Sequence, residues 1–254
     1  MRSVLTIAGS DPSGGAGLQA DLKVFKSMGT YGLSIPTVLT AQNSEGVVDI
    51  QEISSDFFMK QFDVLLSDIS PDAVKIGMVY TADVVEIISR QVMEKSLVNI
   101  VLDPVTLSSS GSSLSKEGTL DAIRDHILPV SRVITPNIYE AFALTGIEIK
   151  CVEDMKKSAV KLMALGPETV IITGGHLDDL AIDLLYDGKD FIELESERLE
   201  GDFHGTGCVF SSAVAAGLAL GYDVRELAVK SKDLVLKAME SAIQIGKGMK
   251  MLNL

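Results

Sequence analysis

Short apolar segments alternate with segments of helical spacing along almost the whole chain. Runs rich in Val, Ile and Leu and bounded by turn-forming residues are typical of buried strands. This pattern predicts strands at residues 4–8, 34–40, 73–77, 98–103, 132–135 and 169–173, and a hairpin of residues 182–186 and 191–194 around Asp187-Gly188. Amphipathic spacing predicts helices at residues 18–28, 56–69, 82–93, 120–127, 138–144, 155–165, 209–220 and 225–245.

This order of elements is typical of a mostly parallel sheet with helices on both faces. The chain has 254 residues, 46% of them hydrophobic, which is enough to bury a large core. We find no internal repeat and no linker long enough to separate two domains. We therefore expect one α/β domain over residues 1–254.

The composition narrows the classes of partner and location. A formal net charge of −13 disfavours nucleic acid and anionic membranes, so a phosphate site would have to be built locally. Neither a membrane span nor a signal peptide is predicted. The two cysteines, Cys151 and Cys208, indicate a reducing compartment rather than a disulfide framework, and we expect a cytoplasmic protein.

Polar motifs fall where the predicted strands end. In open parallel sheets, ligands bind beyond the carboxyl ends of the strands, so such a series predicts one long crevice. The motifs are Gly9-Ser10-Asp11, Gln42-Asn43, Gly77-Met78, Asp103-Pro104-Val105, Pro136-Asn137 and Gly174-Gly175-His176.

The segment His204-Gly205-Thr206-Gly207-Cys208 opens directly into an apolar helix. The first turn of a helix leaves backbone N–H groups without intrahelical partners, and the helix dipole adds positive potential there. This arrangement favours a bound anion. We also expect the helix end to lower the pKa of the Cys208 thiol. An anion site beside a polarised side chain indicates phosphoryl transfer.

The earlier segment Gly15-Ala16-Gly17-Leu18-Gln19-Ala20 matches a dinucleotide-binding pattern after a strand. Such a site usually has an acidic residue at the end of the second strand, whereas Gln42-Asn43 stands here. The segment also lacks the Lys-Ser/Thr pair of a P-loop. We reject a nicotinamide site; one alternative is that these glycines only permit a tight turn and close helix packing.

Taken in order, the motifs resemble those of the hydroxymethylpyrimidine/phosphomethylpyrimidine kinases of thiamine biosynthesis, members of the ribokinase superfamily. The resemblance covers nearly the whole chain. It implies a ribokinase-like three-layer α/β/α sandwich with a mostly parallel central sheet of about eight to ten strands. The further segments that carry it are Gln19-Ala20-Asp21-Leu22-Lys23, Val74-Lys75-Ile76-Gly77-Met78 and Thr135-Pro136-Asn137-Ile138-Tyr139-Glu140-Ala141.

The resemblance implies that Gln42 recognises the pyrimidine edge, since its amide offers both a donor and an acceptor. A strand-end cap is the alternative for Gln42. Four further positions match residues that line the same pocket, although Met78 and Val105 could equally be ordinary core. These positions are Gly9, Asp21, Met78 and Val105.

The resemblance further implies ATP and Mg2+ as cofactors. Asn137 and Glu140 would orient the metal through water, or else form only a helix cap. Gly205, Thr206 and Gly207 would form the anion hole for the transferred phosphoryl group. Nucleotide contacts are implied at Asn137, Thr173, Gly175, Gly205 and Gly207.

Cys208 stands where most ribokinase-like enzymes have an aspartate that acts as base toward the attacking hydroxyl. We expect Cys208 to assist as this base, with a small buried space-filling residue as the alternative. Two departures from the family pattern remove positive charge: Thr173 replaces a frequent lysine, and the flap at residues 106–111 lacks a basic residue.

The activity implied is phosphorylation of 4-amino-5-hydroxymethyl-2-methylpyrimidine and then of its monophosphate, by a homodimer. Pyridoxal kinase is an alternative, in which Cys208 would add to the substrate aldehyde. The lost positive charge also leaves open a non-catalytic relative that only binds the pyrimidine.

Overall fold

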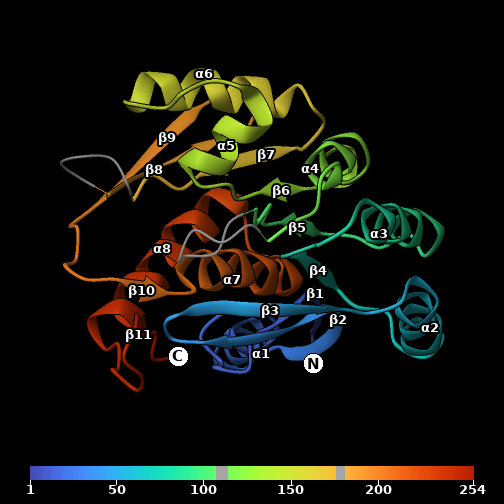
Figure 1. Ribbon diagram of the computed structural model, residues 1–254. Coiled ribbons are helices and arrows are strands. Elements are labelled where there is room, and N and C mark those ends of the chain that lie inside the picture. The colour runs from blue at the N-terminus through green and yellow to red at the C-terminus, as the bar shows by residue number, and fades with distance from the viewer. Residues whose placement is uncertain (107–113, 176–180) are drawn as a thin grey trace.

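The computed structural model describes residues 1–106, 114–175 and 181–254. Most of the flap and His176 lie outside these residues. Within them, one nine-stranded sheet has the order β3-β2-β1-β4-β5-β6-β7-β8-β9 (Figure 1). Its strands are β1 (Ser3–Ser10), β2 (Tyr31–Asn43), β3 (Gly46–Glu52), β4 (Ala73–Ile76), β5 (Ile100–Leu102), β6 (Val133–Ile134), β7 (Thr169–Ile172), β8 (Ala181–Tyr186) and β9 (Phe191–Ser196).

The six inner strands, from β2 to β7 in the sheet order, are parallel. The edges are antiparallel, with β3 on β2 at one side and the hairpin β8–β9 at the other. The mostly parallel sheet and the hairpin are therefore confirmed. Strand β3 was not predicted from the sequence, because most of its side chains are exposed and form no apolar run.

Helices cover both faces of the sheet (Figure 1). On one face of the sheet, Leu5, Ile7 and Ile76 pack in a hydrophobic cluster with residues of one helical layer. On the other face, Val4, Ala73 and Val101 pack in a second cluster with residues of the opposite layer. The predicted three-layer α/β/α sandwich is confirmed. The first layer consists of α2 (Ser55–Leu66), α3 (Ala82–Glu94), α4 (Thr119–Ala122), α5 (Ile138–Thr145) and α6 (Val152–Met163), and the second of α1 (Gly17–Ser27), α7 (Thr206–Leu220) and α8 (Val224–Glu240).

Two helices also differ from the sequence-based prediction. The short helix α4 continues through a π-helical turn (Ile123–Ile127) into a 3-10 turn (Leu128–Val130). Helix α8 ends at Glu240 rather than at residue 245, and the chain returns to pair β11 (Lys250–Met251) with β10 (Phe203–His204). On this return a Cβ at Gly248 would lie 2.1 Å from the carbonyl oxygen of Ser44, so only glycine fits there.

The sheet reverses its winding at β1, which places a ligand-binding edge at that point. Strand β1 is followed through α1 by β2 on one side, whereas β4 and the later strands lie on the other. The carboxyl ends of β1 and β4 therefore border a topological switch point. Among the described residues, no helix has the length and apolar content needed to cross a bilayer.

Candidate active site

Two glycine-containing loops pack tightly together at the switch point. Gly205 has φ +85°, and a Cβ there would stand 1.9 Å from the carbonyl oxygen of Gly15. Gly17, with φ +55°, approaches Gly9 so closely that a Cβ would lie 2.3 Å from its carbonyl oxygen. The backbone approach requires glycine at both positions. The loop after β1 and the loop before α7 thus form one closely packed floor.

The first turn of α7 lies on this floor. Gly205 is its N-cap, and the first helical hydrogen bond runs from Val209 N–H to Gly205 O at 2.9 Å. The N–H groups of Thr206, Gly207 and Cys208 therefore fall in the turn that an α-helix leaves without intrahelical partners. Gly207 is exposed, and a Cβ there would meet no atom within 4 Å. The geometry is that expected of an anion-binding helix end.

Cys208 lies half-buried between the N-termini of α1 and α7. Burial raises the pKa of its thiol to about 12; the charge of Lys75 and a hydrogen bond from Gly17 N–H oppose this increase, and the negative charges of Asp103 and Asp21 add to it. The expectation that the helix end lowers this pKa is wrong, because removal from water outweighs the helix dipole. The thiol is protonated at neutral pH.

A buried ion pair lies beneath this turn. Lys75 Nζ is 3.0 and 3.1 Å from the two carboxylate oxygens of Asp21, and both side chains are fully buried. The hydroxyls of Thr6 and Ser212 donate to the same carboxylate at 2.5 and 2.6 Å. Asp21 was expected to line the substrate pocket. In the structure its carboxylate oxygens have these four internal contacts, and its side chain has no accessible surface.

Asp103 extends the buried cluster toward α5. Its carboxylate accepts a hydrogen bond from Ser211 of α7 at 2.9 Å and lies 3.9 Å from Lys75 Nζ. Burial raises the pKa of Asp103, although the charge of Lys75 acts against the increase. Sequence analysis assigned no role to Lys75 or Asp103. Lys75 could have been recognised in the sequence, because a lysine in the middle of an otherwise apolar strand indicates a buried charge that needs a partner.

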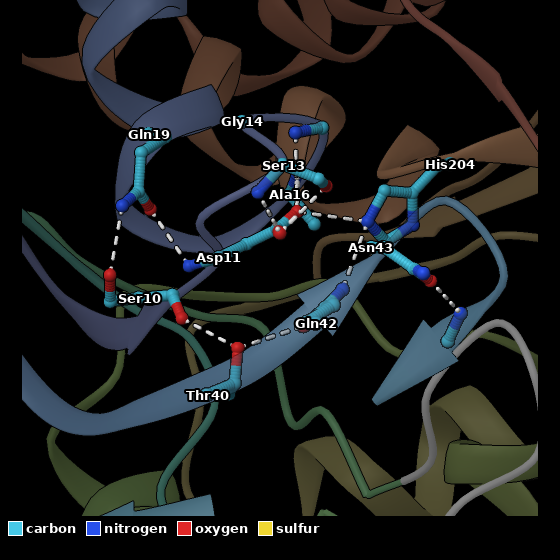
Figure 2. A network of polar contacts seen from close by, with 12 residues as sticks. Ser10, Asp11, Ser13, Gly14, Ala16, Gln19, Thr40, Gln42, Asn43 and His204 are labelled. Carbon is cyan, nitrogen blue, oxygen red and sulfur yellow. Dashed lines mark hydrogen bonds and ion pairs between the residues drawn. The ribbon is translucent and has the colours of Figure 1, made fainter. Parts of the chain in front are cut away.

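Gln42 lies in a polar network that joins β2 to both loops (Figure 2). His204 is buried, with Nε2 2.9 Å from an Asp11 carboxylate oxygen and 3.0 Å from the Gln42 amide nitrogen. The same Asp11 oxygen accepts the N–H groups of Gly15 and Ala16 at 3.1 and 2.9 Å. Burial alone would raise the pKa of Asp11, but these polar contacts lower it overall. Sequence analysis assigned no individual role to Asp11 or to His204.

Asn137 and Glu140 form a capping box at the start of α5. Asn137 Oδ1 accepts the N–H groups of Tyr139 and Glu140 at 2.9 Å, and Glu140 Oε2 accepts the N–H of Asn137 at 2.8 Å. The helix cap, given above as the alternative role of these two residues, is therefore formed in the structure. Burial and the charge of Asp103 together raise the pKa of Glu140 to about 8. Adjacent buried acids of this kind favour a cation between or beside them.

The remaining predicted residues divide between this edge of the sheet and an apolar cluster. Met78 is buried with Val38 and Leu114, and Val105 packs against them. A Cβ at Gly9 would lie 2.9 Å from Met78 Sδ, so Gly9 also borders this cluster. Thr173, beyond β7, bridges to Asn137, and a Cβ at Gly175 would meet open space. Thr173 and Asn137 thus lie together at the carboxyl edge of the sheet.

Comparison with known proteins gives relatives with two named activities. The hydroxymethylpyrimidine/phosphomethylpyrimidine kinase of Bacillus subtilis is 38% identical, over 96% of this chain and 91% of that protein. The pyridoxine kinase of the same organism is 39% identical, over 97% of this chain and 93% of that protein. The bifunctional thiamine biosynthesis protein ThiED of Geobacter sulfurreducens is 40% identical over 97% of this chain, which spans only 51% of its length.

Solved structures share the fold at comparable identity. An ADP complex of the Bacillus subtilis pyridoxal kinase has a TM-score of 0.92 at 38% identity and covers 100% of this chain and 97% of its own. The phosphomethylpyrimidine kinase of Clostridium difficile 630 has a TM-score of 0.84 at 40% identity, over 94% of this chain and 100% of its own. The chain is therefore a kinase with the ribokinase-like fold. Since the model of the family described as phosphomethylpyrimidine kinase matches residues 11–253, the chain belongs to that family.

Proposed function

We propose that the protein transfers the γ-phosphoryl group of ATP to the hydroxymethyl group of 4-amino-5-hydroxymethyl-2-methylpyrimidine, and then to the resulting monophosphate. The open first turn of α7 is the observation that carries this proposal. This turn lies at the same edge of the sheet as Gln42. His204 contacts both Gln42 and Asp11, and so connects Gln42 to the loop after β1. An anion site and an amide that matches an aminopyrimidine edge thus belong to one connected structure.

The N–H groups at Gly205, Thr206 and Gly207 would stabilise the negative charge that spreads over the transferring phosphoryl group. Catalysis of phosphoryl transfer depends mostly on alignment and electrostatic stabilisation. Preorganised backbone donors on a closely packed floor supply both. Thr173 and Gly175, at the end of β7, and Asn137 would contact the nucleotide.

Cys208 would lie beside the attacking hydroxyl and assist the reaction. Because its thiol is protonated at neutral pH, the resting protein holds no thiolate base. Proton abstraction contributes little to a loose phosphoryl-transfer transition state, compared with positioning. An assisting role for Cys208 is consistent with this.

Asn137 and Glu140 would hold a magnesium ion through its water shell. The donor set fits a hard cation, because burial and the charge of Asp103 raise the pKa of the Glu140 carboxyl group, and a cation nearby would offset both effects. When bound, Mg2+ supplies positive charge that neutralises the phosphate oxygens. Among the described residues, no group of three or more His, Cys, Asp or Glu side chains is arranged to bind a metal ion directly.

Pyridoxal kinase activity is a second candidate. A relative named pyridoxine kinase and a solved structure named pyridoxal kinase match this chain at identities similar to those of the pyrimidine kinases. Incubation with ATP, Mg2+ and each alcohol, followed by phosphorus NMR, separates the two activities. The pyrimidine should give a monophosphate and then a diphosphate. Formation of pyridoxal phosphate alone would support the second candidate, and binding without phosphoryl transfer would contradict both kinase activities.

We further propose that residues 1–254 act as one domain and that the protein is a cytoplasmic homodimer. The two cysteines are both free, which fits a reducing compartment. The edge strand β3 is open to a second copy, and Leu39 and Val48 on β2 and β3 are 48% and 84% exposed. Light scattering on the purified protein measures the assembly directly, and a monomer at micromolar concentration would contradict the dimer.

A further inference from the structure

The Gln42 side chain has polar neighbours on both sides of its amide (Figure 2). Its nitrogen lies 3.0 Å from His204 Nε2, and its oxygen lies 3.2 Å from the Thr40 hydroxyl. The residue is only half-buried, so each end of the amide keeps capacity for a ligand. Oxygen and nitrogen of a carboxamide occupy the same outline, and the protons around them decide which faces which neighbour.

The hydroxyl proton of Thr40 is already used in a hydrogen bond to Ser10. Its hydroxyl lies 2.8 Å from the carbonyl oxygen of Ser10, which can only accept a hydrogen bond. The single hydroxyl proton therefore points at Ser10, and Thr40 Oγ1 has only lone pairs left for Gln42. An amide nitrogen that donates to Thr40 satisfies both groups. An amide oxygen in that place would face a lone pair.

The proton of His204 is fixed by the same reasoning. Nε2 lies 2.9 Å from an Asp11 oxygen that already accepts two backbone N–H groups, so Asp11 needs a donor from the ring rather than a lone pair. Nδ1 is buried and has no hydrogen-bond partner among the residues that the structure describes. A proton on Nδ1 would leave a buried donor unpaired, which costs more than a bare acceptor. Nε2 therefore carries the proton, and an amide nitrogen cannot face it.

We propose that Thr40 and His204 are positioning residues that fix the Gln42 amide in one orientation, with its oxygen toward His204 and its nitrogen toward Thr40. The His204 N–H is then shared between Asp11 and Gln42, and Gln42 donates to Thr40. The His204 ring lies close to Gly15, where a Cβ would stand 2.4 Å from the ring and 2.5 Å from Met251 Sδ.

A fixed amide makes the site selective for one hydrogen-bonding pattern, and this consequence rests on the proposed function of Gln42 in recognising the substrate. A 4-aminopyrimidine offers a donor amine next to an acceptor ring nitrogen. The oxygen of Gln42 then accepts from the amine, and its nitrogen donates to the ring. The 4-oxo analogue, with a carbonyl next to a ring N–H, presents the reverse pattern. An amide that cannot turn rejects the analogue, whereas a freed amide turns and accepts both.

The test compares kcat/KM for the amino substrate and its 4-oxo analogue. Thr40→Val removes the acceptor at constant shape, and His204→Leu removes the donor. Both should lower the amino-to-oxo ratio by about tenfold or more, the discrimination of a bidentate amide contact. The conservative variant Thr40→Ser keeps a hydroxyl, and His204→Gln keeps an N–H donor. Both should keep the amino-to-oxo ratio near that of the native protein. Met251→Leu alters the packing against Gly15 without changing a hydrogen bond, and should also keep it.

A second measurement is independent of activity. Nitrogen-15 NMR of the labelled histidines reports which ring nitrogen is protonated, and the chain has only three histidines. Loss of one signal in His204→Gln assigns that residue. We expect protonation at Nε2. Protonation at Nδ1 alone, or an unchanged amino-to-oxo ratio in Thr40→Val, would overturn the inference. A native protein that phosphorylates neither alcohol would instead contradict the proposed function, and the tautomer would still test the inference.

Discussion

Lys75 and Asp21 form an ion pair with 3.0 Å between Nζ and Oδ2, and neither side chain has any accessible surface. Removing two charges from water is costly, and such a pair persists only where the remaining hydrogen-bonding capacity is used. Thr6 and Ser212 complete the shell of Asp21 from β1 and α7. The pair therefore ties the sheet to both helices whose N-termini meet at Cys208.

Lys75→Met should destabilise the protein strongly. The variant keeps the volume of the side chain but leaves the buried Asp21 carboxylate without a cation. Breaking one side of a buried pair costs about 3–5 kcal/mol. The free energy of unfolding, measured by urea denaturation, should fall by about this amount.

The matched control is Lys116→Met, which removes a lysine from an ion pair with Glu52 that is half-exposed on both sides. The free energy of unfolding should fall much less in this variant, because water already solvates both charges. Adding Asp21→Leu to Lys75→Met should recover part of the lost stability. Equal losses in the two single variants would show that burial of the Lys75 pair has no energetic consequence.

Cys208 should react slowly with iodoacetamide at pH 7. Its folded-state pKa is raised to about 12, so the protonated form dominates at neutral pH and only the thiolate is nucleophilic. The rate should rise about tenfold for each pH unit below that pKa, because the thiolate fraction grows in this proportion. Mass spectrometry after timed alkylation measures the rate at each cysteine.

Cys151, which is exposed at the N-cap of α6, serves as the internal reference and should be modified first. Cys151→Ser isolates the Cys208 signal. Modification of Cys208 as fast as Cys151 at pH 7 would contradict the raised pKa and would restore the thiolate base to the proposed mechanism.

The apolar runs predicted the inner strands and the parallel sheet because each run is buried on both sides by helices. Strand β3 gave no such signal: Val48 is 84% exposed, and the strand is defined only by its pairing with β2. The two-residue strands β10 and β11 likewise exist through a contact between distant segments. Pairing of this kind has no local pattern in the sequence.

The position of the site was predictable, but the contacts within it were not. The motifs do gather at the carboxyl edge of the sheet, because parallel strands end together there. The sequence places Asp21 on α1 without showing which way it faces, and the structure buries it against Lys75. For the same reason the pKa of Cys208 was predicted with the wrong sign: a local motif shows the helix end but not the burial.

Stability should fall as pH rises from about 5 to 8, with Glu140 as one cause. Burial, followed by the charge of Asp103, raises the folded-state pKa of Glu140 from 4.5 to about 8. Between these values the folded protein holds a proton that the unfolded chain has lost, so raising the pH favours unfolding. Urea denaturation at several pH values measures this slope.

Glu140→Gln should make the slope shallower, because glutamine keeps the cap to the Asn137 N–H but cannot ionise. Glu148→Gln is the control at an exposed glutamate and should leave the slope unchanged. A slope in Glu140→Gln as steep as in the native protein would assign the pH dependence to other groups.

Gly205→Ala should disrupt the floor of the site. The residue has φ +85°, and the new Cβ would stand 1.9 Å from the carbonyl oxygen of Gly15. Strain at a left-handed position alone costs about 1–3 kcal/mol, and the clash must be added to it. Thermal unfolding should shift to lower temperature and kinase activity should be lost. A variant as stable as the native protein would show that the two loops can separate freely.

Gly207→Ala should separate function from stability at the same turn. A Cβ there would meet no atom within 4 Å, and Gly207 lies within α7, so the folded protein should be as stable as before or slightly more so. If the phosphoryl group lies over this open position, the new methyl group displaces it. A shift of about 1 Å can cost about 100-fold in rate, and kcat/KM should fall by this order. The measurement pairs initial rates with the melting temperature of both variants. An unchanged kcat/KM in Gly207→Ala would show that the transferred phosphoryl group does not lie over the first turn of α7.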